Sequence, residues 1–320
     1  MALFRVFDRI REYNMKMAFI GLGQMGRPMA INLLRSHPGL LVNTASGRAY
    51  AELERQGAFA TDDRRALADC DLVFLSLPDD EVVDQVLFGV QGLAQWMRPD
   101  SIVVDTSTIS YALTVRIEAR LAALGIHFLD APVSGMPSRA ADGTLTAMCG
   151  GNEQMFNEVA PHLERMASNI LYMGAAGAGQ LAKLINQLLF DINCAAIAEI
   201  LPMAVKLGLN AEKVAAIVNS GTGRSYASEF FVPHILAGQF NSGYPLKHAY
   251  KDLINGAGLS AKMGIPLPVL SAATATYQTA ILQGHGDSDK GAMIKVYERL
   301  LSVEFRATAP SGDGSTLHPQ

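Results

Sequence analysis

The sequence predicts a two-domain protein: a doubly wound α/β first half, followed by an all-helical second half. The chain has 320 residues, about twice the usual size of one domain. Up to about residue 172, short continuous apolar runs alternate with helical segments, which indicates a parallel sheet covered by helices on both faces. Beyond about residue 177 the apolar runs of strand length stop, and only helical periodicity remains.

The expected strands are short and continuously apolar, as buried parallel strands are. They lie at 17–20, 40–43, 71–77, 101–104 and 127–129. Helical segments lie between most of them, at 25–35, 49–56, 81–87 and 111–124. In the second half, a helix at 179–207 precedes helical segments at about 211–219, 226–237, 246–263, 269–283 and 289–301.

These patterns predict an N-terminal extension at 1–16, a Rossmann-type domain at 17–177, an all-helical domain at 178–306 and a disordered tail at 307–320. The long helix at 179–207 joins the two domains. It is apolar beyond one face, which indicates burial in its own domain or against a second copy of the chain. We therefore expect a homodimer or homotetramer.

Composition excludes several classes of protein. A net charge of −4 is not the footprint of a nucleic-acid binder, and 49% apolar residues are too many for a disordered chain. The three cysteines (Cys70, Cys149 and Cys194) are too far apart for a disulfide framework or a cysteine-zinc site. The histidines also lack metal-ligand spacing, so we expect no metal.

A cytoplasmic protein without a membrane segment is expected. The first 17 residues carry charges throughout and lack the apolar run of a signal peptide. The longest apolar stretch, 181–209, contains too many polar residues to span a bilayer.

A G-x-G-x-x-G motif follows the first expected strand and opens a helix. Its residues are Gly21, Leu22, Gly23, Gln24, Met25 and Gly26. The first glycine permits a tight turn, the second lets the backbone approach a pyrophosphate, and the third lets helix and strand pack closely. The motif therefore predicts a dinucleotide site, with a ligand-free glycine turn as the alternative.

The end of the second strand is where such domains read the adenosine ribose. Thr44, Ser46 and Arg48 follow that strand, and the nearest acid in sequence is Glu52, inside the next helix. Lack of an acid favours NADP, without excluding NAD; alternatively, Arg48 is an exposed residue at a helix start. Leu77 and Pro78 end the strand at 71–77 and are expected at the cofactor, unless the proline only terminates the strand.

Four motifs in this order resemble the β-hydroxyacid dehydrogenase superfamily, and within it the 3-hydroxyisobutyrate dehydrogenases and tartronate semialdehyde (2-hydroxy-3-oxopropionate) reductases. They are residues 20–33 (IGLGQMGRPMAINL), 130–135 (DAPVSG, continuing to 143–145 and 150–151), 177–187 (GAGQLAKLINQ) and 250–253 (YKDL). The resemblance covers residues 17 to about 301.

The resemblance implies that Lys183 is the general acid/base of the reaction. A single lysine is more often a solvated surface charge. Here the helix around it is largely apolar, and burial lowers the pKa of an ammonium toward neutrality, where it can exchange a proton.

The resemblance also assigns the substrate carboxylate to Ser134 and Gly135, and places Thr108 beside both nicotinamide and substrate. Thr108 lies in a Ser-Thr pair that alternatively caps the next helix. Where the family usually has a second glycine, this chain has Met136, a departure that puts the identity of the substrate in question.

In the helical half, the resemblance implies that Gln187 or Asn186 holds the substrate, and we favour Gln187. Tyr244 matches an aromatic position that lines the pocket in some members. Lys251 and Asp252 match a pair that reaches the nicotinamide from the helical domain; without the resemblance they read as an ordinary surface pair.

Together these residues imply hydride transfer between a nicotinamide and a small 3-hydroxy or 3-oxo acid, in a cleft between the domains. An imine reductase is one alternative, although those enzymes usually replace the lysine. A non-catalytic dinucleotide-binding protein is another. A decarboxylating 6-phosphogluconate-type enzyme has a much larger helical half.

Overall fold

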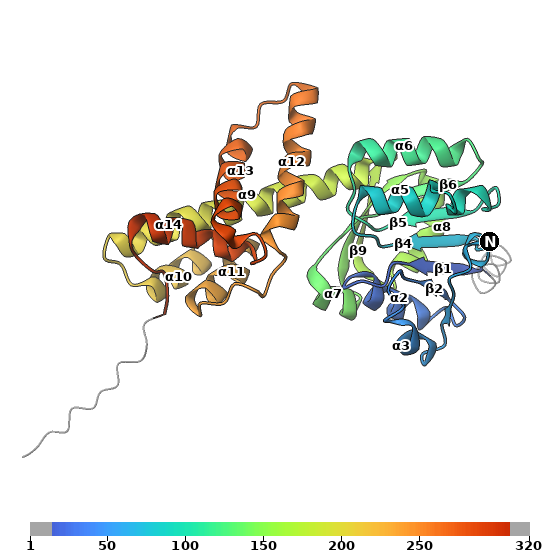
Figure 1. Ribbon diagram of the computed structural model, residues 1–320, viewed down its shortest axis with the longest axis horizontal. Helices are drawn as coiled ribbons and strands as arrows, with labels where there is room; N and C mark the ends of the chain where they lie inside the picture. Colours follow the sequence, from blue (N-terminus) through green and yellow to red (C-terminus); the bar gives the residue numbers. More distant parts are fainter. Residues whose placement is uncertain (1–14, 308–320) are drawn as a thin grey trace, which may run out of the picture. The chain divides into compact units, whose positions relative to one another are not determined.

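The structure is a computed structural model that describes residues 15–307. Most of the expected N-terminal extension and C-terminal tail therefore lies outside the described residues. The chain divides into two compact units between Lys183 and Leu184. The first unit holds the sheet and the second is helical (Figure 1).

Six parallel strands form the main part of the sheet in the first unit. They are β1 (Met17–Ile20), β2 (Leu41–Asn43), β3 (Phe59–Ala60), β4 (Leu72–Leu75), β5 (Ile102–Asp105) and β6 (His127–Asp130). Their order is β3-β2-β1-β4-β5-β6, which is that of a Rossmann fold. The five expected strands are confirmed, and β3 is an additional strand of only two residues.

Three further strands extend this sheet beyond the expected parallel part. They are β7 (Val133–Ser134), β8 (Leu145–Gly151) and β9 (Ala167–Gly174). β8 runs antiparallel to β6 and β7 and parallel to β9. The predicted parallel sheet is therefore extended by a mixed edge of three strands that the sequence analysis did not predict. β8 is buried, but Thr146 and two final glycines interrupt its apolar sequence. Most of β9 is exposed, so neither sequence shows a continuous apolar run.

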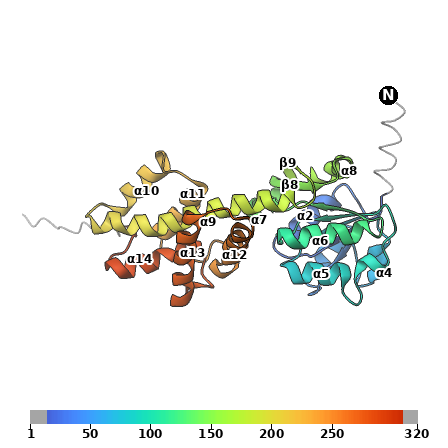
Figure 2. The same cartoon turned by 90° about the horizontal axis from the view of Figure 1, so that it is seen from above.

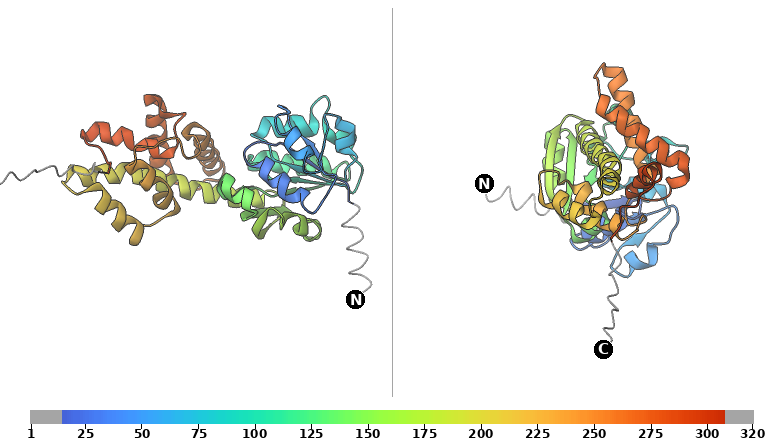
Figure 3. Two further views of the ribbon diagram at one scale, coloured as in Figure 1. Left: turned by 90° about the horizontal axis from the view of Figure 1, so that it is seen from below. Right: turned by 90° about the vertical axis from the view of Figure 1, so that its left-hand side faces the viewer.

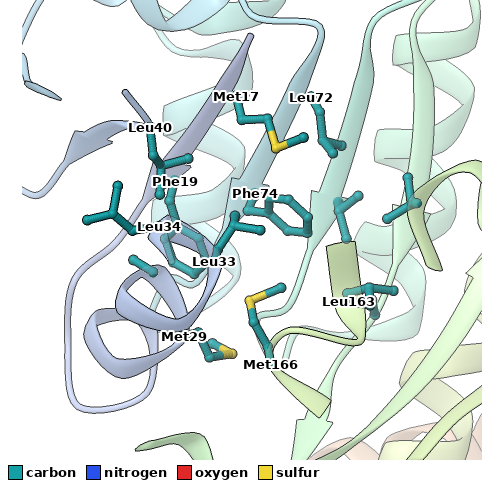
Figure 4. Close-up of a cluster of buried hydrophobic side chains, with 14 of the residues drawn as sticks. Met17, Phe19, Met29, Leu33, Leu34, Leu40, Leu72, Phe74, Leu163 and Met166 are labelled. Carbon is teal, nitrogen blue, oxygen red and sulfur yellow. The ribbon is translucent and has the colours of Figure 1, made fainter. Parts of the chain in front are cut away.

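Helices cover both faces of the sheet, which explains why the central strands β1 and β4 are apolar and buried at every position. They are α2 (Gly26–Leu34), α3 (Tyr50–Glu54), α4 (Arg64–Ala68), α5 (Asp80–Phe88), α6 (Tyr111–Ala122), α7 (Met136–Asp142) and α8 (Glu153–Leu163). Phe19 and Phe74 point to one face, where they pack with Leu33 of α2 (Figure 4). Ile20 and Leu75 belong to a second cluster, together with residues of α5 and α6, and these two helices cover the other face of the sheet (Figure 2).

The second unit is built around α9 (Ala178–Lys206), whose first six residues belong to the first unit. Its other α-helices are α10 (Ala211–Ser220), α11 (Tyr226–Leu236), α12 (Leu246–Met263), α13 (Pro268–Ala280) and α14 (Ile294–Leu301). The π-helix η2 (Ile281–His285) and the 3-10 helix η3 (Lys290–Met293) lie between α13 and α14. The other helices lie along the second-unit part of α9 (Figure 3), and small residues of α9, such as Ala195 and Ala198, belong to their shared core.

A buried ion pair crosses this helical core. The Lys290 ammonium contacts the Asp191 carboxylate, and their side chains are 2% and 0% exposed. Lys290 Nζ lies 4.1 Å from the ring centroid of Phe190, and the Tyr277 hydroxyl donates to Asp191 Oδ1 at 3.1 Å. Removing one partner would strand the other charge away from water, which costs more than the pair contributes.

Replacing Lys290 with Met should therefore lower the free energy of unfolding by about 3 kcal/mol. The double variant Lys290→Met, Asp191→Leu should recover most of that loss, because no unpaired charge remains. Urea denaturation followed by circular dichroism measures both. Equal stability of the single and double variants would contradict this account of the pair.

Among the helices within residues 15–307, only α9 is long and apolar enough to cross a membrane. Buried helices of soluble proteins have the same length and composition. In α9, 39% of the most apolar window is already buried inside the protein, so its composition is weak evidence for a membrane span.

Candidate active site

The glycine loop joins β1 to α2 with almost no space between backbone segments. Gly21 has a φ of +100°, and a Cβ added there would lie 2.1 Å from the Ser76 carbonyl oxygen. A Cβ on Gly26 would lie 1.8 Å from the Gly21 carbonyl oxygen. Both positions therefore require glycine, Gly21 for the turn and Gly26 for the approach of helix to strand.

Gly23 differs, because a Cβ added there would meet no atom of the described residues within 4 Å. The loop is therefore open at Gly23, where a ligand could approach its backbone. The N-cap of α2 is Met25, which makes no side-chain capping bond among the described residues. The N–H groups of the loop and helix start thus suit an anion, and this arrangement fits the pyrophosphate of a dinucleotide.

The end of β2 lies directly beside this loop, because Gly21 N donates to Asn43 O at 2.9 Å. Thr44, Ser46 and Arg48 follow Asn43 on the connection to α3. Thr44 N donates to the hydroxyl of Tyr50 at 3.1 Å, and the side chains of Ser46 and Arg48 are exposed. The position of all three beside the glycine loop is compatible with adenosine binding.

The acidic residue at the end of β2 is not the one that lies nearest to it in the sequence. Glu52, the nearest acid in sequence, pairs with Arg27 of α2 at 2.8 Å. Asp62, which follows β3, instead places its Oδ1 at 3.0 Å from Asn43 Nδ2. Sequence reasoning missed Asp62 because a two-residue strand leaves no apolar run to mark the chain's return to this edge.

The loops after β4 and β5 are joined by a hydrogen bond. Leu77 N, which precedes Pro78, donates to Ser107 Oγ at 2.8 Å. Thr108 follows Ser107 and is half-buried. The carboxyl ends of two neighbouring parallel strands therefore bring Leu77 and Thr108 to one edge of the sheet, where such folds bind ligands.

Asp130 anchors the start of α9. Its carboxylate accepts hydrogen bonds from Gly177 N at 2.7 Å and Gln180 N at 2.8 Å, at the end of the helix where the dipole favours negative charge. Burial raises the pKa of Asp130 to about 6, against the lowering effect of these N–H groups. β6 thus holds the helix that carries Lys183.

Gln180 fixes the loop around Thr108 to the same helix. Its Nε2 donates to Ser107 O at 2.7 Å, and its Oε1 accepts from Ile109 N at 3.2 Å. These two backbone groups flank Thr108. Lys183 lies one helical turn after Gln180 and is only 8% exposed. Gln180 therefore ties the loop that carries Thr108 to the helix that carries Lys183. The sequence analysis did not single out Gln180.

Replacing Gln180 with Leu should lower kcat about tenfold or more, because small misplacements of reacting groups are costly. The dissociation constant for the cofactor should stay the same, since Gln180 does not touch the glycine loop. Steady-state kinetics and fluorescence titration measure the two quantities. The exposed Gln154→Leu serves as the control, and an unchanged kcat in Gln180→Leu would show a purely structural role.

Ser134 and Gly135 form a half-buried corner between β7 and α7. Gly135 has a φ of +141°, and a Cβ there would lie 3.1 Å from Leu145 Cδ2. Met136 has a φ of +61°, a left-handed conformation in which glycine carries no steric cost. This backbone conformation explains why the family that the sequence resembles usually has glycine at this position. In this chain the side chain of Met136 lies at the corner instead.

In the second unit, Gln187 and Asp252 lie together. Gln187 Nε2 donates to Asp252 Oδ2 at 3.3 Å, and Asp252 is buried. Burial raises the pKa of Tyr244, and the charges of Asp252 and Asp191 raise it further. Asn186 is exposed, with Nδ2 3.5 Å from Gln187 Oε1.

Lys251 is half-buried beside Asp252 in α12.

Metal-ligating residues do not gather anywhere in the part of the chain that the structure describes: no group of three or more His, Cys, Asp or Glu could hold an ion. The three cysteines are buried free thiols.

Comparison with known families assigns both halves of the chain. Residues 16–174 match the family described as the NAD binding domain of 6-phosphogluconate dehydrogenase. Residues 177–297 match the family described as NAD-binding of NADP-dependent 3-hydroxyisobutyrate dehydrogenase.

Characterised relatives align over nearly their whole length. The chain is 36% identical to 2-(hydroxymethyl)glutarate dehydrogenase of Eubacterium barkeri, over 91% of this chain and 98% of that protein. It is 35% identical to 2-hydroxy-3-oxopropionate reductase of Escherichia coli, over 89% of this chain and 97% of that protein.

Solved structures agree with this assignment. The 3-hydroxyisobutyrate dehydrogenase of Mycobacterium tuberculosis has a TM-score of 0.80 and 32% identity, over 88% of this chain and 99% of that one. Psf3, solved with NADP+ and 2-OPP, has a TM-score of 0.77 and 28% identity, over 88% of this chain and 99% of that one. An imine reductase from Pseudomonas sp., at 18% identity and a TM-score of 0.58 over 88% of this chain and 99% of that one, shares the fold alone.

Proposed function

We propose that this chain, which belongs to the β-hydroxyacid dehydrogenase family, acts on a small 3-hydroxy acid or the matching 3-oxo acid. Its activity is that of an NAD(P)-dependent oxidoreductase of hydroxy acids. Tartronate semialdehyde and 3-hydroxyisobutyrate are the types that we expect. The observation that supports this proposal is the buried Lys183, on a helix start that Asp130 anchors and that Gln180 bonds to the loop around Thr108.

Lys183 is the general acid/base in this proposal. The bound nicotinamide supplies the hydride for reduction, or takes it in oxidation. During reduction, Lys183 Nζ gives a proton to the carbonyl oxygen of the substrate, and during oxidation it takes the hydroxyl proton. Its low exposure keeps bulk water away from this exchange.

The corner after β7 holds the substrate carboxylate in this proposal. The Ser134 hydroxyl and the N–H group of Gly135 supply donors for an anion, and the positive φ of Gly135 suits a concave arrangement of N–H groups. Thr108 orients the substrate from the loop that Gln180 holds.

The helical unit contributes an amide of defined orientation. Because Gln187 Nε2 faces the Asp252 carboxylate, the amide presents Oε1 as its acceptor. We propose that Oε1 accepts a hydrogen bond from the substrate hydroxyl, with Asn186 and Tyr244 beside it. Lys251 and Asp252 are assigned to the nicotinamide side.

A substrate panel tested with NADH and NADPH separates these proposals. We expect turnover of tartronate semialdehyde or a close 3-oxo acid, with NADPH preferred and NADH also accepted. Arg48→Ala should raise KM for NADPH and leave KM for NADH unchanged, if Arg48 meets the 2′-phosphate. Lack of turnover with every small 3-oxo and 3-hydroxy acid would overturn the proposed substrate class.

We also propose that the enzyme self-associates through its helical unit. Large apolar side chains of α9 stay exposed, namely Ile185, Leu189, Ile200 and Met203, and such clusters usually meet a partner. Light scattering should show a dimer or tetramer, and Met203→Asp should weaken it. A monomeric wild-type protein at micromolar concentration would contradict the proposal.

A cytoplasmic location is proposed as well, supported by the three free thiols, which suit a reducing compartment. Cell fractionation tests it, and recovery of the protein in a secreted or membrane fraction would contradict it.

A further inference from the structure

The ribose-reading position of this Rossmann unit is occupied by an unusual cluster. Asn43 is the last residue of β2 and lies one hydrogen bond from the glycine loop. In this strand order, the residue at the end of β2 faces the ribose that carries adenine. Asn43 itself is buried, and its side-chain amide bonds to other residues of the protein.

The Asn43 amide is committed to three acceptors. Nδ2 contacts the Tyr50 hydroxyl at 3.2 Å, Thr61 O at 2.8 Å and Asp62 Oδ1 at 3.0 Å. These contacts use the two amide hydrogens inside the protein. Asn43 is therefore a support for its neighbours, rather than a donor for a ligand.

Asp62 is the exposed member of the cluster. β3 pairs with β2 in parallel, with Ala60 opposite Val42, so Asp62 reaches the same carboxyl edge. Its Oδ1 also accepts from the Tyr50 hydroxyl at 2.8 Å, and these two bonds fix the carboxylate. Both of these bonds go to Oδ1, and Asp62 is exposed, so Oδ2 is available to accept a bond from a solute.

We infer that Asp62 reads the adenosine ribose and thereby limits the preference of the enzyme for NADP(H). A fixed carboxylate accepts a hydrogen bond from a 2′-hydroxyl and repels a 2′-phosphate. Arg48, on the connection after β2, has the opposite effect. The inference rests on the proposed cofactor site and names its specificity-determining residue, which comes from the strand beside β2 rather than from β2.

Direct binding of cofactor fragments tests the inference without any turnover. Calorimetry on the full chain gives dissociation constants for ADP-ribose and for its 2′-phosphate. In Asp62→Asn, the ratio of the two should move toward the phosphorylated fragment by about tenfold or more, the effect of a hydrogen bond to a charged group. The ratio of kcat/KM for NADPH and NADH should move in the same direction.

Asp63→Asn is the matched control, since it removes the same charge one residue away. Asp63 caps α4 by accepting from Arg65 N at 2.9 Å, and Asn caps helices equally well. Its fragment ratio should stay within about twofold of the wild type.

Two results would overturn the assignment of Asp62. One is an equal ratio in Asp62→Asn and Asp63→Asn. The other is an equal loss of both fragments in Asp62→Asn, which would mean that Asp62 only supports Asn43. A wild-type chain that binds neither fragment would instead refute the proposed cofactor site.

Discussion

Replacing Lys183 with Met is expected to lower kcat by about a thousandfold, within the range for removal of a general acid/base. Lys183 is buried on the first turns of α9, and Met keeps the apolar stem while removing the exchangeable proton. Because the hydride donor is untouched, the dissociation constant for the cofactor should stay near that of the wild type. Steady-state kinetics and fluorescence titration report these two values.

The control is Lys206→Met, at the far end of the same helix. Lys206 is exposed and its Nζ donates to Leu301 O at 3.1 Å, so its loss affects only a surface contact of the helical unit. In Lys183→Ala, small primary amines added to the solution should restore part of the rate, because they supply the missing proton donor. A Lys183→Met variant that retains more than about a tenth of the wild-type kcat would refute the assigned role.

Two alanine variants of the glycine loop should fail in different ways. In Gly26→Ala the new Cβ would lie 1.8 Å from the Gly21 carbonyl oxygen, a backbone atom that cannot yield without moving the strand or the helix. We expect this variant to lose stable folding of the first unit. In Gly23→Ala the methyl group meets nothing within 4 Å in the described residues, so the variant should fold like the wild type.

Gly23→Ala should nevertheless weaken cofactor binding by about a hundredfold, because the methyl group occupies space that the pyrophosphate needs. Losing one or two hydrogen bonds to a charged group accounts for that factor. Thermal unfolding and cofactor titration separate the two failures. Normal cofactor binding in Gly23→Ala would show that the phosphates do not approach the loop there.

Sequence patterns predicted those parts of the fold whose burial is uniform. β1, β4, β5 and β6 lie between two helical layers, so β1 and β4 are apolar throughout and β5 and β6 have apolar centres. The long helices of the second unit were equally visible from their apolar periodicity. β9 was not, because an edge strand with mostly exposed side chains has the composition of a loop.

The candidate site shows the same division. The glycine loop could be found from the spacing of its glycines alone, because the backbone around Gly21 and Gly26 leaves no room for a side chain. Gln180 and Asp62 act through partners 73 and 19 residues away, and no local pattern reports such contacts. The polar character of Gln180 inside a buried helix start was the only available signal.

We propose that hydride passes between a nicotinamide and the carbonyl carbon of a small 3-oxo acid, with the proton exchanged by Lys183. Mass spectrometry of the product formed from tartronate semialdehyde and NADPH deuterated at C4 tests it most directly. We predict one deuterium on the former carbonyl carbon with the wild type, and product formation about a thousandfold slower with Lys183→Met. Product without deuterium from either C4 face, or equal rates for both proteins, would contradict the claim.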